Sequence, residues 1–90
     1  MPQYVIERDL PGADCLTEEE LQVIARRSNE VLAAMAPRAQ WQHTFLTRDK
    51  LFCVYQADDE ATIREHAAAG GFPVTEVREV LTILDPGTAD

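Results

Sequence analysis

Two helical segments that alternate with strand-like runs restrict this 90-residue chain to few folds. The first segment begins at Thr17, which can form a capping box with Glu20, and it ends before Pro37. Its core-facing positions recur at helical spacing, at Leu21, Ile24, Ala25, Ser28, Val31, Leu32 and Met35. Asp58 can cap a second helix, and Gly70-Gly71 predicts where that helix ends.

Four further runs are rich in β-branched and aromatic residues, and each predicts a strand. They cover residues 3–8, 40–47, 51–56 and 74–84. Arg48 and Asp49 form a polar break between the second and third runs, so these two runs should pair as an antiparallel hairpin. Asp85-Pro86-Gly87 closes the last run, and residues 87–90 are expected to form a loose tail.

The element order is therefore β-α-β-β-α-β, which is that of the ferredoxin-like fold. This α+β architecture places a four-stranded antiparallel sheet under two helices that share one face, in a single domain spanning residues 1–90. The opposite face would be open, and we expect Cys53 and Tyr55 to lie on it. Because these residues are too apolar for a wet surface, we predict a homodimer through the open sheet face.

The charge balance narrows the classes of partner. Sixteen acidic and eight basic residues give a formal net charge of −8, which opposes nucleic acid or an anionic membrane and suits cations, including metal ions. No apolar run approaches the roughly 18 residues of a membrane span, and no signal peptide is readable. The two cysteines form no disulfide framework. We therefore expect a soluble, cytoplasmic protein.

His43 and His66 are the only histidines, so a metal site or an acid–base site would start from them. A two-residue hairpin turn pairs His43 with Val54. On that register, the face of His43 also holds Trp41, Phe45, Phe52 and Val54. The opposite face holds Gln42, Thr44, Cys53 and Tyr55. A metal site shared by His43 and Cys53 would then require a β-bulge.

Each candidate also has a purely structural interpretation. His43 could be a core or edge histidine with one satisfied nitrogen. His66 lies near the end of the second helix, where an imidazole can cap the last carbonyls. Cys53 could be a small core residue, as free cysteines usually are.

Glu7 and Arg8 place two charges on a strand that is central in this topology, and they must point to opposite faces. A charge there is unfavourable unless it is paired or ligated, so one of the two should have a specific partner. Arg78, with Glu76 or Glu79, can supply partners from the last strand. We favour a structural ion pair over a catalytic acid.

Three stretches carry a family resemblance: residues 4–12, the hairpin Trp41-x-His43 with Cys53-Val54-Tyr55, and residues 64–67 leading into 70–73. In combination they resemble the DUF4242 family of small bacterial proteins, which are often labelled nickel-binding. The similarity extends from Pro2 to about Pro86. It implies a ferredoxin-like fold, a dimeric α/β barrel, and Ni(II) binding in some members with a role in sequestration or resistance. We predict no organic cofactor.

Among the matching positions, the chemically sensible ligands for Ni(II) are His43, His66, Glu7 and Cys53, because this ion accepts imidazole, carboxylate and thiolate. We therefore predict a small nickel-binding protein for sequestration or homeostasis, and we favour a non-enzymatic role. The alternative is a cofactor-independent dimeric α/β-barrel enzyme of the monooxygenase, cyclase or isomerase type. In that case His43 would be the base, and Tyr55 or Glu7 would orient a small organic substrate.

Overall fold

The computed structural model describes residues 1–89 and has the expected β-α-β-β-α-β order. The strands are β1 (Gln3–Asp9), β2 (Ala39–Leu46), β3 (Lys50–Ala57) and β4 (Glu76–Glu79). The α-helices are α1 (Glu18–Met35) and α2 (Glu60–Gly70), and two short 3-10 helices are η1 (Ala13–Cys15) and η2 (Pro86–Ala89). Within this part of the chain, no helix is both long enough and apolar enough to cross a membrane.

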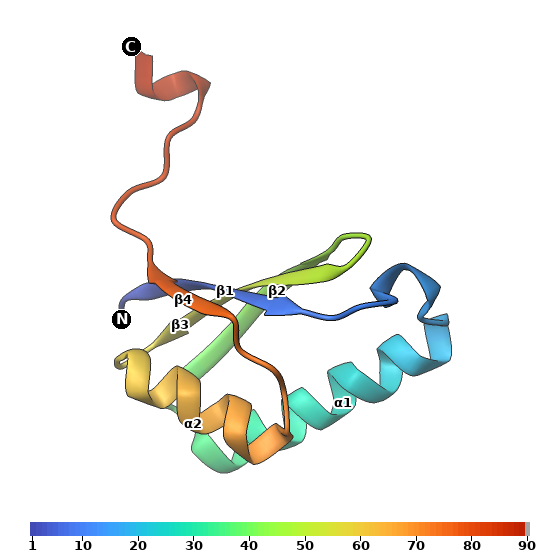
Figure 1. Ribbon diagram of the computed structural model, residues 1–90. Coiled ribbons are helices and arrows are strands. Elements are labelled where there is room, and N and C mark those ends of the chain that lie inside the picture. The colour runs from blue at the N-terminus through green and yellow to red at the C-terminus, as the bar shows by residue number, and fades with distance from the viewer. Residues whose placement is uncertain (90) are drawn as a thin grey trace.

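The four strands form one antiparallel sheet in the order β2-β3-β1-β4, so β1 and β3 are central. Both helices lie on the same side of this sheet (Figure 1). The predicted α+β, ferredoxin-like fold is therefore confirmed. The side under the helices is called the covered face below, and the other side is called the open face.

Local side-chain chemistry sets where each helix begins. The Thr17 hydroxyl accepts a hydrogen bond from the Glu20 amide at 3.1 Å, and the Glu20 carboxylate accepts one from the Thr17 amide at 3.0 Å. The predicted capping box of α1 is thus confirmed. Helix α2 is capped by Asp59 and not by Asp58 as expected, because the Asp59 carboxylate accepts from the Thr62 amide at 2.8 Å.

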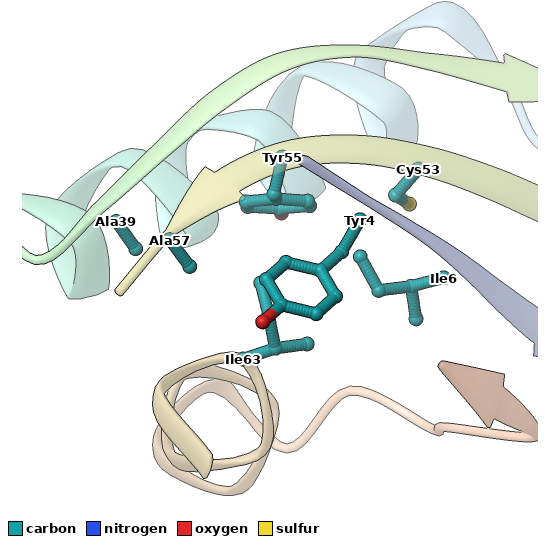
Figure 2. Close-up of a cluster of buried hydrophobic side chains, with 7 residues drawn as sticks. All are labelled: Tyr4, Ile6, Ala39, Cys53, Tyr55, Ala57 and Ile63. Carbon is teal, nitrogen blue, oxygen red and sulfur yellow. The ribbon is translucent and has the colours of Figure 1, made fainter. Parts of the chain in front are cut away.

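The core lies between the covered face and α2 (Figure 2). Its buried members are Tyr4, Ile6, Ala39, Cys53, Tyr55, Ala57 and Ile63. The expectation that Cys53 and Tyr55 lie on the open face was wrong. In the β1–β3 pairing, Cys53 opposes Ile6 and Tyr55 opposes Tyr4, so all four side chains point toward the helices.

The β2–β3 hairpin has the predicted antiparallel pairing, but a β-bulge interrupts it between Trp41 and His43. His43 opposes Val54 as expected, whereas Trp41, and not Gln42, opposes Tyr55. The extra residue shifts the alternation of side chains, so Trp41 lies on the covered face and not on the face of His43. The bulge does not bring His43 to the face of Cys53.

Strand β4 is much shorter than the strand predicted over residues 74–84, because it spans only Glu76–Glu79. The physical reason is the absence of a partner: β1 begins at Gln3, whose carbonyl accepts from the Val80 amide at 2.8 Å. Residues 80–89, called the C-terminal arm below, then rise from the sheet on its open side (Figure 1). The arm exposes its apolar side chains: Leu81 by 89%, Ile83 by 68% and Leu84 by 76%. The predicted tail at 87–90 falls within η2 as far as Ala89, and residue 90 lies outside the described residues.

Candidate functional site

His43 lies on the open face, on edge strand β2, and its side chain is exposed. Its ring packs edge-to-face against Phe45, with ring centroids 5.0 Å apart. A depression beside it is bounded by Gln3, Val5 and Val54 of the sheet and by Val80, Thr82 and Ile83 of the C-terminal arm. The imidazole is therefore accessible to an ion or to a second molecule.

Glu7 lies on the open face and forms an ion pair with the ammonium group of Lys50 at 3.3 Å. The same ammonium group also pairs with Asp9. The hydrogen bond from Lys50 lowers the pKa of Asp9, and the same contact raises the pKa of Lys50. The partner of Glu7 is therefore Lys50 and not Arg78 as expected. Arg78 instead pairs with Glu76 on its own strand, at 3.6 Å.

His66 lies on the opposite side of the sheet and is fully buried, with 0% of its surface exposed. Its Nε2 atom is 3.2 Å from the Ser28 hydroxyl, which is 3.3 Å from the Tyr55 hydroxyl. Its ring also lies against Phe72, with centroids 5.4 Å apart. Among residues 1–89, no group forms a hydrogen bond with Nδ1 of His66. His66 thus links α2 to α1 and the sheet, and it does not cap helix carbonyls.

The surroundings of His66 keep its imidazole neutral. Burial lowers the pKa of His66, and the positive charge of Arg8 lowers it further, against the opposite effect of the Ser28 hydrogen bond. Burial also raises the pKa of Tyr55. The Ser28–Tyr55–His66 network is therefore uncharged near neutral pH, and Arg8 is the charged group beside it.

Acidification should destabilise the protein through His66. In the unfolded chain His66 binds a proton near the ordinary histidine pKa of 6.5, whereas the folded chain disfavours this protonation. The contribution of His66 to the free energy of unfolding is therefore fully present above that pH and is lost as the pH falls below it. Between pH 7 and about 5, we expect the free energy of unfolding to fall with a slope of up to about 1.4 kcal/mol per pH unit. Urea denaturation at several pH values measures this slope.

A matched pair of variants assigns the slope. His66→Gln keeps a polar atom near Ser28 but removes the titrating group, so its stability should depend far less on pH in this range. His43→Gln leaves the contacts of His66 intact and should retain the full slope. An unchanged slope in His66→Gln would show that another group is responsible.

The four predicted metal ligands do not converge within one copy of the chain. His43 and Glu7 lie on the open face, whereas His66 and Cys53 are buried on the covered face. The described residues contain no group of three or more His, Cys, Asp or Glu side chains placed to hold a metal ion. The alternative catalytic set is divided in the same way, because Tyr55 lies on the covered face.

A cavity of about 330 Å³ lies between α1 and the covered face. Much of its wall is apolar, with contributions from Leu16, Leu21, Ile24, Trp41, Leu51 and Phe72. The polar side chains that reach it include Arg8, Ser28, Thr44 and Tyr55. The cavity explains why Leu21, Ile24 and Ala25 of the predicted α1 stripe are not buried, since these residues line it, whereas Ser28 and Met35 are buried.

Arg8 is the residue of this cavity whose role the sequence left unassigned. Its side chain is 3% exposed, and its Nη1 atom donates to the Pro73 carbonyl at 2.7 Å. Its Nε atom lies 3.4 Å from the Cys53 sulfur, and its guanidinium carbon lies 5.6 Å from the centre of the Phe72 ring. The sequence did contain a sign of this burial: Glu7 and Arg8 are adjacent on a central strand and point to opposite faces, so one of the two charges had to face the helices.

Comparison with known proteins adds a family and a structural neighbour. The sequence model of a family described as "Nickel responsive protein SCO4226-like" matches residues 4–80. The crystal structure of SCO4226 from Streptomyces coelicolor A3(2) is similar, with a TM-score of 0.76 and 10% sequence identity over 91% of this chain and 99% of that chain. At this identity the structural likeness establishes the fold alone. None of the curated proteins matches this chain.

Proposed function

Because this chain belongs to the SCO4226-like family of nickel-responsive proteins, we propose that it binds Ni(II) for sequestration or homeostasis and catalyses no reaction. The DUF4242 resemblance stays a prediction, and it points to the same metal. The observation that carries the proposal is the exposed imidazole of His43 on the open face. Nickel accepts imidazole nitrogen, and a net charge of −8 favours cations around the protein.

We propose that two copies of the chain complete the nickel site. One copy offers no cluster of three ligands within residues 1–89, so His43 needs ligands from elsewhere. A homodimer through the open face, as in a dimeric α/β barrel, would bring a second His43 to this surface, with Glu7 as the predicted carboxylate ligand on that face. Phe45 beside His43 is 59% exposed, and burying it would favour such a contact.

The proposal places the protein in the cytoplasm. Cys15 is exposed and Cys53 is buried, and both are free thiols. A reducing compartment keeps such cysteines unpaired. His66 and Cys53 have no part in the proposed nickel site, because they lie behind the sheet.

Isothermal titration of the untagged, metal-free protein with Ni(II) tests the proposal. We expect a dissociation constant of about 1 μM or lower and a stoichiometry of one ion or fewer per chain. His43→Ala should weaken binding by more than the 10–100-fold that loss of an outer-shell partner typically causes. Zn(II) and Co(II), titrated in parallel, report the selectivity of the site.

His66→Gln is the matched control, because it removes the other histidine without altering the open face. This variant should bind Ni(II) as the unaltered protein does. Undiminished binding in His43→Ala would contradict the proposed ligand. If His66→Gln lost Ni(II) binding and His43→Ala kept it, the nickel site would lie on the covered face.

A further inference from the structure

The cavity between α1 and the sheet contains a buried cation without a matching anion. Arg8 is 3% exposed, and among the described residues it forms no ion pair. Its contacts with the Pro73 carbonyl, the Cys53 thiol and the Tyr55 hydroxyl supply no carboxylate. Burial of an unpaired charge is strongly unfavourable. By contrast, the charges on the other face of β1 are compensated, since Glu7 contacts Lys50.

The guanidinium group retains the capacity to bind an anion. Arginine has five N–H donors, of which Arg8 uses one for Pro73 and one for Cys53, and Arg8 also interacts with the Tyr55 hydroxyl at the cavity wall. The remaining donors form part of the planar fork that matches a carboxylate. The hydroxyl groups of Ser28 and Tyr55 reach the same cavity, and because they share a hydrogen bond, one of the two can donate to a ligand.

The rest of the cavity suits an apolar body. Trp41 and Phe72 contribute aromatic surface, and Leu21 and Ile24 of α1 contribute aliphatic surface. A volume of about 330 Å³ corresponds to about eleven non-hydrogen atoms at the volume that each water occupies in the liquid. It also falls within the range of small-molecule sites.

We propose that this cavity binds a small organic monoanion, namely a carboxylate with an apolar aliphatic or aromatic body, whose charged group lies against Arg8. A single negative charge neutralises the guanidinium, whereas a dianionic phosphate ester would leave a net negative charge in an apolar site. The proposal goes beyond nickel binding and does not depend on it, because His43 lies on the other face of the sheet.

Octanoate and octanamide form the test pair, because they share size and shape and differ in charge. Titration of the full-length protein should show octanoate binding at least about tenfold more tightly than octanamide, and octanoate should raise the melting temperature. Inorganic phosphate should bind more weakly than octanoate. Equal binding of octanoate and octanamide, tighter binding of phosphate, or no binding of octanoate at millimolar concentration would each overturn the proposal.

Two variants locate the site. Arg8→Met should abolish the preference for octanoate over octanamide. Ala25→Phe should weaken both compounds at least about tenfold by filling the cavity, whereas Ala33→Phe, on the exposed side of the same helix, should change neither. Octanoate binding that persists unchanged in Ala25→Phe would overturn the proposal, even if Arg8→Met failed to fold.

Discussion

Gly70→Ala is expected to lower the melting temperature by about 5–15 °C, although replacing glycine by alanine in a helix usually stabilises a protein. The usual gain is about 0.5–1 kcal/mol. Here a Cβ atom at Gly70 would overlap the ring of Phe72. Overpacking of this kind costs about 1–3 kcal/mol, so a net loss of about 1–2 kcal/mol is expected. For a domain of this size, each kcal/mol shifts the melting temperature by about 4–8 °C.

The same substitution should disturb the cavity. Phe72 lies against both His66 and the Arg8 guanidinium, so a displaced ring removes one wall and one partner of the buried cation. Octanoate binding should therefore weaken together with stability. Gly87→Ala in η2 makes the same chemical change at an exposed position and should alter the free energy of unfolding by less than about 0.5 kcal/mol. A Gly70→Ala variant as stable as the unaltered protein would show that Phe72 relaxes freely.

Features that depend on neighbouring residues were predictable from the sequence. The capping box of Thr17 and Glu20 is local chemistry, and so is the end of α2 at Gly70-Gly71. The length of β4 was not predictable in this way, because residues 80–84 have strand-forming side chains but no strand beside them. A strand exists only where another segment accepts its backbone hydrogen bonds.

The candidate site depended on long-range geometry, so less of it could be foreseen. Alternation along β1 required Glu7 and Arg8 to point to opposite faces, and they do. The helices bury whichever of the two residues faces them. The sequence of β1 alone does not show on which side the helices pack. The bulge before His43 was not predicted either, because the alternation of Trp41, His43 and Phe45 with Gln42 and Thr44 fits a regular strand. The cavity itself arises from how α1 lies across the sheet.

Replacing Leu81 and Ile83 with aspartate is expected to convert the proposed homodimer into a monomer. Both side chains are largely exposed on the C-terminal arm, and Ile83 borders the depression beside His43. Burying one such side chain contributes about 1.5–3 kcal/mol, and a two-fold symmetric contact would count each position twice. The double variant would therefore lose about 6–12 kcal/mol of association free energy. A dimer of micromolar affinity has an association free energy of about 8 kcal/mol, so this loss is enough to dissociate it. Light scattering coupled to size-exclusion chromatography measures the mass in solution.

Nickel titration of this double variant separates the two parts of the proposed function. A monomer that no longer binds Ni(II) would support a site completed by two copies, since His43 itself is intact. A monomer that binds Ni(II) with full affinity would mean that one copy suffices and that the shared site is wrong. Ala33→Asp with Ala61→Asp adds the same two charges on the exposed sides of the helices, away from the open face. This control should keep both the dimer and its nickel affinity, because any effect of charge alone would appear there as well.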